Sequence, residues 1–297
     1  MIKGIIPALV TPFNRDMTIN HEEAAKLLDY TMEGGVHGLF ILGTNGEFYA
    51  VDDNEVAEYT KFVTEYVKDR LPVFVGLGSN STEMTIKKGH RLISNGAECF
   101  TVITPFFQAL TDRELIAYYT EVADALKTPM LIYNIPARTN INVSPYVVKV
   151  LSENKYIVGI KDSSGNMDNL KSYIDASEGR DFSVLCGSDS KILKALSLGA
   201  TGAVASTSNL IPKVIVGIYD AYNKGDLELA QKCQDDVEPL RQTMHLAGTP
   251  AVLKKSLQMI GIDAGYPARP VMAAEDPEVV SKIEEMLKYY KLGSFNA

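Results

Sequence analysis

The chain alternates short apolar runs with longer stretches in which apolar residues recur at helical spacing. The short runs are rich in β-branched residues, which predicts strands buried on both faces. The longer stretches predict helices, such as residues 20–35, which end in two glycines, and residues 111–127, where Thr111 and Glu114 have capping-box spacing. The expected strands are 4–10, 37–43, 73–77, 98–103, 129–133, 157–161, 182–186 and 201–205.

Strands that alternate with helices predict a parallel sheet, because parallel strands require crossover connections. The closed arrangement of eight such units is the (β/α)8 TIM barrel. An open, doubly wound sheet is the alternative, disfavoured because no run has the character of an edge strand. After about residue 226 the strand pattern stops and about three helices follow. We therefore expect a barrel over residues 1–225 and a C-terminal helical extension over residues 226–297, packed on the barrel.

Composition and charge exclude several classes of function. The formal net charge of −8 and the interspersed acidic and basic residues argue against a nucleic-acid partner. No apolar run approaches the roughly 18–20 residues of a membrane span. The three cysteines, Cys99, Cys186 and Cys233, lie far apart in apolar surroundings, which is typical of a reducing, cytoplasmic compartment. The four histidines show no metal-ligand spacing, so no metal site is expected.

Barrel enzymes place their chemistry at the carboxyl ends of the strands, and two of the predicted ends carry reactive side chains. Lys161 ends the sixth run, in VGIKDSSGNM, and Tyr133 ends the fifth, so the two should be neighbours on one rim. Desolvation in an apolar barrel mouth favours the neutral amine, which attacks carbonyl carbons to form a Schiff base. The phenol of Tyr133 can move protons beside it. The alternative is a lysine that reaches solvent from the strand end or pairs with Asp162.

Two further segments suggest sites for carboxylates. In GTNGE, residues 43–47, glycines flank Thr44 and Asn45, so successive N–H groups can converge on one anion. An ordinary turn is the alternative. Arg138, beyond a proline-containing turn, can hold a second carboxylate or can be a solvated surface arginine. Val204, in the last run, is expected to line the same substrate site.

Together these residues resemble the dihydrodipicolinate synthase/N-acetylneuraminate lyase superfamily of pyruvate-dependent Schiff-base aldolases. The resemblance implies that Lys161 forms the imine with pyruvate or another 2-oxo acid. It implies that Thr44 and the Asn45 amide hold the carboxylate and that Tyr133 is the acid and base. It also implies a homotetramer built from dimers, without metal or organic cofactor. The matching motifs are ALVTPF (8–13), GTNGE (43–47), YNIPARTN (133–140), GIKDSSGN (159–166) and GSD (187–189).

Positions 45, 107 and 138 bear on which reaction of this superfamily the enzyme catalyses. Arg138 matches the arginine by which dihydrodipicolinate synthases hold the carboxylate of aspartate semialdehyde. Asn45, however, replaces a usual threonine, and Phe107 replaces a tyrosine that the partner subunit adds to a hydroxyl relay with positions 44 and 133. We therefore expect an aldolase or lyase that takes pyruvate or a 2-keto-3-deoxy acid, with an aldehyde as its other substrate. A dihydrodipicolinate synthase is a nearly balanced alternative, and a non-catalytic 2-oxo-acid-binding protein is a second one.

The lysine feedback site of some synthases lacks its polar ligands here. The resemblance places Asp53, Val56, Met84 and Phe106 where that site has polar or histidine side chains, and only Asn80 fits it. The sequence therefore predicts an enzyme that does not respond to lysine.

Overall fold

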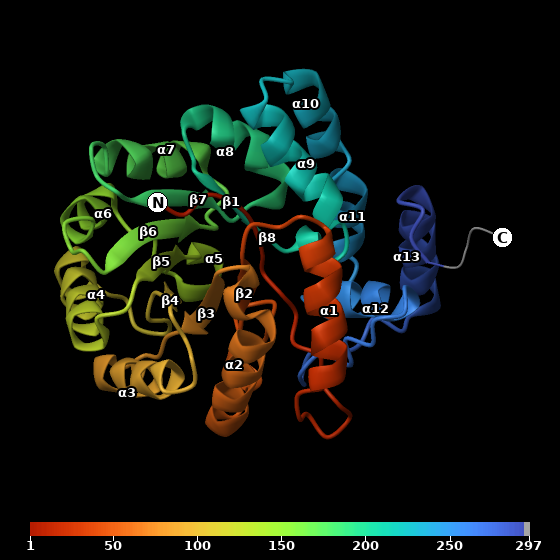
Figure 1. Cartoon of the computed structure of the whole chain (residues 1–297), viewed down its shortest axis with the longest axis horizontal. Coiled ribbons are helices and arrows are strands. Elements are labelled where there is room, and N and C mark those ends of the chain that lie inside the picture. The colour runs from red at the N-terminus through yellow and green to blue at the C-terminus, as the bar shows by residue number, and fades with distance from the viewer. Residues whose placement is uncertain (294–297) are drawn as a thin grey trace.

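Eight parallel strands surrounded by helices make up the structure, a computed structural model that describes residues 1–293 (Figure 1). All the expected strands form, most of them shorter than the apolar runs that predicted them. They are β1 Gly4–Pro7, β2 Leu39–Ile41, β3 Val73–Leu77, β4 Phe100–Ile103, β5 Met130–Asn134, β6 Ile157–Asp162, β7 Ser183–Cys186 and β8 Gly202–Ala205.

The contact between β1 and β2 closes the sheet, whose strand order is β1-β8-β7-β6-β5-β4-β3-β2. Ala8, just after β1, forms a parallel bridge with Phe40 of β2, and the N–H of Leu9 donates to the Phe40 carbonyl at 2.9 Å. The buried Asn209 amide also donates to the Ala8 carbonyl at 2.8 Å, and its oxygen accepts from the Val10 N–H at 3.0 Å. The (β/α)8 barrel is confirmed, and the open doubly wound sheet is wrong.

Helices between the strands cover the outside of the barrel (Figure 1). The helix expected at 20–35 begins after Asn20, whose side chain accepts from the Glu23 N–H. The capping box of Thr111 and Glu114 forms as predicted. The barrel helices are α1 His21–Glu33, α2 Asp53–Val67, α3 Thr82–Ile93, α4 Asp112–Leu126, α5 Pro136–Thr139, α6 Pro145–Leu151, α7 Met167–Ala176, α8 Ile192–Leu198 and α9 Pro212–Asn223.

The described part of the chain ends in four helices, one more than expected: α10 Leu227–Asp235, α11 Glu238–Met244, α12 Ala251–Met259 and α13 Pro277–Tyr289. The first expected helix divides after Asp235 because Pro239 has no N–H and its ring clashes with the carbonyl four residues earlier. In Figure 1, α12 and α13 lie outside the ring of barrel helices. The loop after α12 contacts α1, where the Asp263 N–H donates to Glu23 Oε2 at 2.7 Å.

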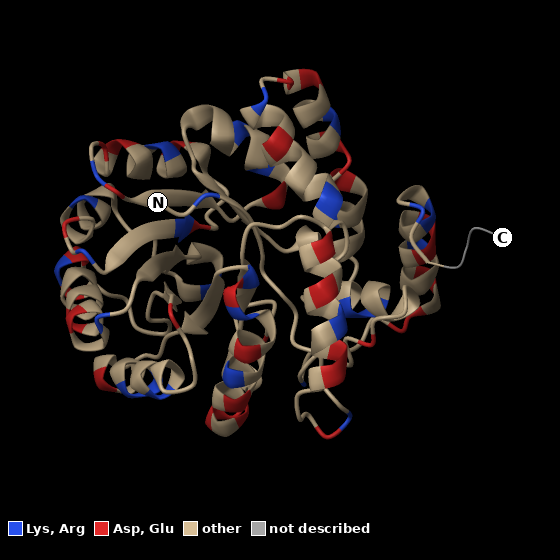
Figure 2. Ribbon diagram, viewed as in Figure 1, with Lys and Arg blue, Asp and Glu red and all other residues tan. Residues whose placement is uncertain are grey.

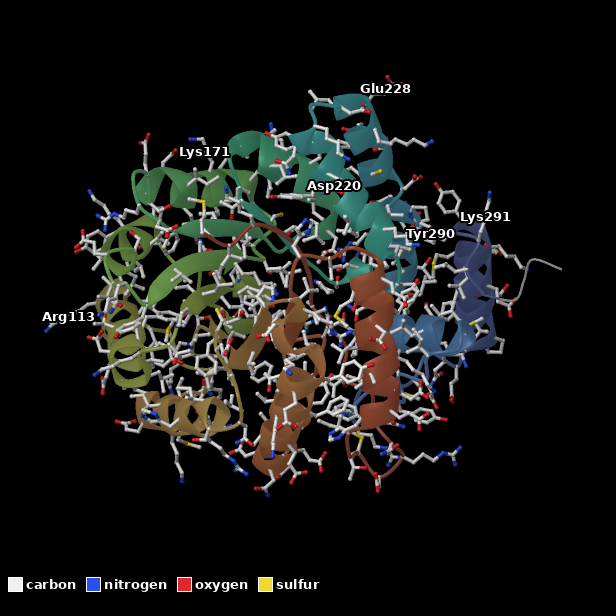
Figure 3. All side chains as sticks on the ribbon, in the orientation of Figure 1. Arg113, Lys171, Asp220, Glu228, Tyr290 and Lys291 are labelled. Atoms are coloured by element: carbon white, nitrogen blue, oxygen red, sulfur yellow. The ribbon has the colours of Figure 1, made fainter. Side chains whose placement is uncertain are left out.

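Apolar side chains fill both the barrel and the layer between strands and helices. The cluster inside the barrel consists of Ile6, Ala8, Phe40, Phe74, Leu131, Leu185 and Val204. Charged residues of both signs lie mainly on the outer helices and loops (Figure 2), and the labelled Arg113 and Glu228 mark the outer edge of the molecule (Figure 3). Within residues 1–293, no helix has the length and apolar character that crossing a membrane requires. A buried charged side chain near the inner cluster is therefore an exception to the general pattern.

Candidate active site

Lys161 is that exception. It lies on β6, paired in register with Tyr133 of β5, and is 4% exposed. Its Nζ lies 3.9 Å from the ring centroid of Tyr133 and 4.8 Å from that of Phe40. The two rings meet edge to face, with centroids 6.3 Å apart. The expectation that Lys161 and Tyr133 are neighbours is confirmed, and the amine lies between two aromatic side chains.

The Lys161 amine has no hydrogen-bonding or ion-pair partner within residues 1–293. Asp162, the next residue, accepts instead from the Asn134 amide at 2.9 Å and from the Ser164 N–H at 3.0 Å. Because successive strand residues point to opposite faces, Asp162 lies behind the barrel wall. A lysine paired to Asp162 or extended into solvent is therefore wrong. An unpaired amine can approach a carbonyl carbon without first breaking an ion pair.

Thr44 and Tyr133 form a hydroxyl pair next to the amine. Thr44 Oγ1 lies 3.1 Å from the Tyr133 hydroxyl, and either oxygen can be the donor. The Tyr133 ring is thus fixed between Lys161 on its face and Thr44 at its hydroxyl. A phenol with a hydroxyl neighbour is suited to take up and return protons at a reacting amine.

The turn after β2 offers free backbone donors. Within residues 1–293, the N–H groups of Thr44, Asn45 and Gly46 have no acceptor. The turn is closed by the Glu47 N–H, which donates to the Thr44 carbonyl at 3.2 Å, and a Cβ on Gly46 would lie 2.9 Å from the Leu42 nitrogen. Consecutive free amides in such a turn form an anion-binding nest, which suits a carboxylate.

The side chain of Asn45 contacts the end of β1. Its Nδ2 donates to the Ala8 carbonyl at 3.4 Å, which ties the turn to the end of β1. The Thr11 hydroxyl donates to the Gly46 carbonyl at 2.8 Å and adds a second tie. The turn is therefore anchored to the strand that closes the barrel.

A cavity of about 380 Å³ opens beside Thr44. Arg138, on α5, is on its wall, and no carboxylate in the described part of the chain pairs with the guanidinium. Burial and the charge of Glu47 raise the pKa of Tyr49, while Arg138 opposes this shift, so both charges act on the phenol. An unpaired guanidinium on a cavity wall is suited to a carboxylate. The lining consists of Thr44, Phe48, Tyr49, Ile103, Phe106, Arg138, Thr139, Gly248, Thr249 and Val271.

Of the expected site residues, only Thr44 and Arg138 line this cavity, whereas Lys161, Tyr133 and Asn45 do not. Phe107 and Val204 also lie apart from it. Phe107, in the loop after β4, is 89% exposed and has a φ of +85°, in the left-handed region. Val204 is buried in the inner cluster beside Phe40 and is not on the cavity wall. The described residues contain no group of three or more His, Cys, Asp or Glu side chains that could hold a metal ion.

The sequence did not predict Phe40, Glu47 or Lys254 as parts of the site. Phe40 contacts the Lys161 amine, and Glu47 forms a buried ion pair with Lys254 at 2.7 Å. A signal for Lys254 was present, because it lies three residues from both Ala251 and Leu257 and so shares the apolar face of its helix.

Comparison with known proteins assigns the family. The model of the dihydrodipicolinate synthetase family matches residues 1–289. The 4-hydroxy-tetrahydrodipicolinate synthase of Archaeoglobus fulgidus is 35% identical over 292 residues, which cover 98% of this chain and 99% of the relative. The enzyme of that name from Thermodesulfovibrio yellowstonii is 36% identical over 264 residues, which cover 88% of this chain and 89% of the relative.

Solved structures agree with this assignment. Dihydrodipicolinate synthase from Thermotoga maritima has a TM-score of 0.94 at 28% identity, covering 98% of this chain and 99% of that one. A prophage protein of the dihydrodipicolinic acid synthase family from E. coli K12, solved with pyruvate, has a TM-score of 0.92 at 30% identity and the same coverage. Fold and relatives define a Schiff-base, pyruvate-dependent barrel enzyme of the lyase type. The chain belongs to the dihydrodipicolinate synthetase family.

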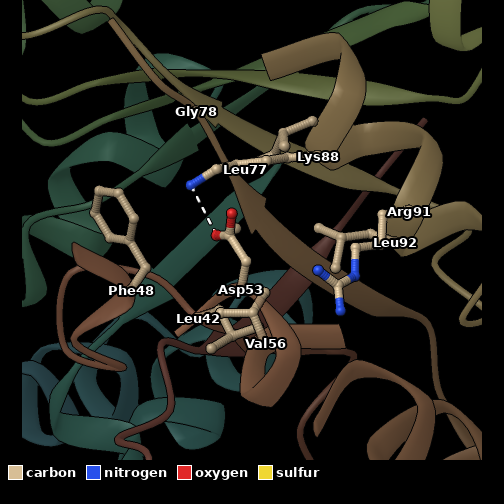
Figure 4. A pocket seen from close by; sticks show the side chains of 10 residues that line it. Leu42, Phe48, Asp53, Val56, Leu77, Gly78, Lys88, Arg91 and Leu92 are labelled. Atoms are coloured by element: carbon tan, nitrogen blue, oxygen red, sulfur yellow. Dashed lines mark ion pairs between the residues drawn. The ribbon is translucent and has the colours of Figure 1, made fainter. Parts of the chain in front are cut away.

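Two of the five positions of the lysine feedback site, Asp53 and Val56, line a second, smaller pocket (Figure 4). Asp53 pairs with Lys88 at 2.9 Å, an ion pair that Figure 4 shows beside Leu77 and Gly78. The Asn80 oxygen accepts from the Phe106 N–H at 2.8 Å, so it is already engaged. The pocket has a volume of about 40 Å³, against about 380 Å³ for the cavity beside Thr44.

We expect millimolar lysine to leave the reaction rate unchanged, because Asp53 and Asn80 are engaged within the chain and Val56 and Met84 offer no polar atoms for an ammonium or carboxylate. Initial rates measured with and without lysine test this. Strong inhibition, abolished by Asp53→Ala, would contradict it and would show that the ion pair opens to admit the amino acid.

Proposed function

We propose that this enzyme is a class I aldolase that acts on pyruvate or a 2-keto-3-deoxy acid through an imine at Lys161. One observation carries the proposal: the buried Lys161 amine has no counter-ion among the described residues and lies against Phe40 and Tyr133, next to the Thr44–Tyr133 hydroxyl pair. The free amides of residues 44–46 supply the site for the carboxylate of the 2-oxo acid.

The reaction follows from these positions. With the pyruvate carboxylate on the amides of residues 44–46, the Lys161 amine adds to the ketone carbon, and loss of water gives the imine. Removal of a proton from the methyl group then gives the enamine. The enamine carbon attacks the aldehyde carbon, and hydrolysis of the imine releases the product and restores the amine. Tyr133 moves protons in these steps, with Thr44 as its hydrogen-bond partner.

The cavity beside Thr44 is the proposed place for the aldehyde. Arg138 is the cation on its wall and pairs with a carboxylate on the acceptor. Apolar side chains, Phe48, Ile103 and Phe106 among them, surround it and exclude water from the reacting carbon. An acceptor with an acid group suits this cavity better than a neutral one.

A dihydrodipicolinate synthase is the second candidate. Arg138 on the cavity wall favours it, as do the names of the relatives at 35% and 36% identity. Asn45 and Phe107 favour the cleavage or synthesis of a 2-keto-3-deoxy acid instead, because the relay tyrosine is replaced by a side chain that carries no proton. A protein that only binds 2-oxo acids has no need of a nucleophile, a phenol and a hydroxyl in contact.

We further place the enzyme in the cytoplasm as a homotetramer built from dimers. The cysteines, Cys99, Cys186 and Cys233, are free thiols. The exposed ring of Phe107 supports assembly, because a second copy of the chain would cover it. Residues 1–225 are the proposed barrel domain and residues 226–297 the proposed extension, of which 294–297 lie outside the described residues. Val204 is a proposed contact of the 2-oxo acid.

Trapping with borohydride tests the imine. Pyruvate and borohydride should attach a reduced pyruvyl group to the peptide that contains Lys161, because hydride reduces the imine to a stable secondary amine. Lys161→Ala should abolish labelling and turnover, measured by mass spectrometry and by rate. Lys155→Ala, at a lysine just before β6, is the matched control and should behave as the wild type. Labelling that survives Lys161→Ala would refute the mechanism.

The variant Phe107→Tyr tests whether the enzyme is a 2-keto-3-deoxy acid aldolase or a dihydrodipicolinate synthase. A placed proton-transfer group typically raises a reaction rate by roughly 10²–10⁴-fold. Phe107 is exposed in the single chain, so the added hydroxyl meets no side chain of its own copy. The wild type should turn over a 2-keto-3-deoxy acid well and condense pyruvate with aspartate semialdehyde slowly. The variant should accelerate the condensation more than the cleavage, in parallel kcat/KM measurements. Fast wild-type condensation that the tyrosine leaves unchanged would make the synthase the better assignment.

A further inference from the structure

A fully buried ion pair joins the turn after β2 to the C-terminal helices. Glu47 Oε1 lies 2.7 Å from Lys254 Nζ, and the two side chains are 0% and 1% exposed. Glu47 Oε2 accepts from the Ala268 N–H at 2.6 Å. The Lys254 ammonium also donates to the Tyr266 carbonyl at 2.8 Å and lies 4.2 Å from the Phe13 ring centroid. The pair thus connects the turn after β2, α12 and the loop after α12, and it lies against Phe13.

Stability alone does not explain such a pair. The free energy needed to remove two charges from water is about as large as the free energy that their attraction returns. Apolar side chains of similar volume therefore often give a protein of equal stability. Burial lowers the pKa of Lys254 to about 8 even though Glu47 opposes the shift, so desolvation outweighs the attraction. A buried pair retained under these conditions suggests a role in geometry.

Glu47 has an unusual backbone conformation in the turn that carries the free amides. Its backbone has a φ of +55°, in the left-handed region that residues other than glycine rarely adopt. Its N–H closes the turn by donating to the Thr44 carbonyl at 3.2 Å. An unusual backbone conformation persists only where the surroundings fix it. Here the surroundings are Lys254 and Ala268, which hold the carboxylate and leave the backbone little freedom.

The same contacts fix the opposite wall of the cavity. Gly248 and Thr249 come just before α12, which carries Lys254, and Val271 follows the Tyr266–Ala268 segment. All three line the cavity beside Thr44. One ion pair therefore ties the turn that carries the amides of residues 44–46 to segments that supply part of the cavity wall.

We infer that Glu47 and Lys254 are positioning residues: their pair holds the turn so that its free amides converge on the carboxylate of the 2-oxo acid. The inference rests on the proposed function and goes beyond it, since it makes the C-terminal extension part of the active site. Neither side chain touches the substrate. The competing interpretation is a tether that only fastens the extension to the barrel.

The double variant Glu47→Gln/Lys254→Met separates these interpretations. It removes both charges, so neither is left buried alone, and the new side-chain amide still offers an oxygen to the Ala268 N–H. Borohydride trapping at increasing pyruvate gives the half-saturating concentration and the rate at saturation, and thermal unfolding gives Tm. We expect the half-saturating pyruvate concentration to rise on the order of 10- to 100-fold, because small misplacements of binding groups have effects of that size.

The saturating trapping rate should change less than the half-saturating concentration, since Lys161 is untouched, and Tm should exceed that of Lys254→Met alone. The control is Lys282→Met/Glu285→Gln, which removes an exposed pair on α13 and should match the wild type. A double variant with wild-type pyruvate dependence overturns the inference, whatever its Tm.

Glu47→Asp covers the case in which the double variant does not fold. It keeps both charges but shortens the side chain by one methylene, so the turn must shift to keep the pair. The half-saturating pyruvate concentration should rise here too, and an unchanged value overturns the inference. If pyruvate fails to trap the wild type at all, the proposed function itself is wrong, so the two failures are distinguishable.

Discussion

The structure is organised around one buried amine that has no counter-ion among the described residues. Lys161 extends from β6 into an apolar barrel mouth, where Phe40 and Tyr133 face it and Asp162 points to the other side of the sheet. A buried polar group without a hydrogen-bonding partner is costly, which favours a chemical role for this side chain over a structural one. Two neighbouring groups suit a reaction at this amine. The Tyr133 phenol can transfer protons, and the free amides of residues 44–46 can bind a carboxylate.

A polar network behind the barrel wall keeps the reactive side chains in place. The Asn134 amide donates to Asp162 at 2.9 Å and to the Tyr173 hydroxyl at 3.2 Å, and its oxygen accepts from the Val143 N–H at 3.0 Å. Asn134 follows Tyr133, and Asp162 follows Lys161, so the network joins the ends of β5 and β6. Buried polar networks in which each group has a hydrogen-bonding partner make the surrounding structure more rigid.

Local pattern was enough to predict the barrel and the pairing of Tyr133 with Lys161, because strand periodicity and the parallel arrangement determine both. One feature depends on contacts that no local pattern encodes: the Glu47–Lys254 pair joins segments far apart in the chain. The extra C-terminal helix was predictable in principle, since Pro239 forces the break. The exposure of Phe107 could not be read from its apolar character.

A crystal structure of the pyruvate adduct after borohydride reduction tests the central claim most directly. The account predicts continuous density from Lys161 Nζ to the former ketone carbon. It also predicts the carboxylate within hydrogen-bonding distance of the amides of residues 44–46, with the Tyr133 hydroxyl beside the new C–N bond. Density on a different lysine, or a pyruvyl carboxylate bound to Arg138 with those amides unoccupied, would contradict it.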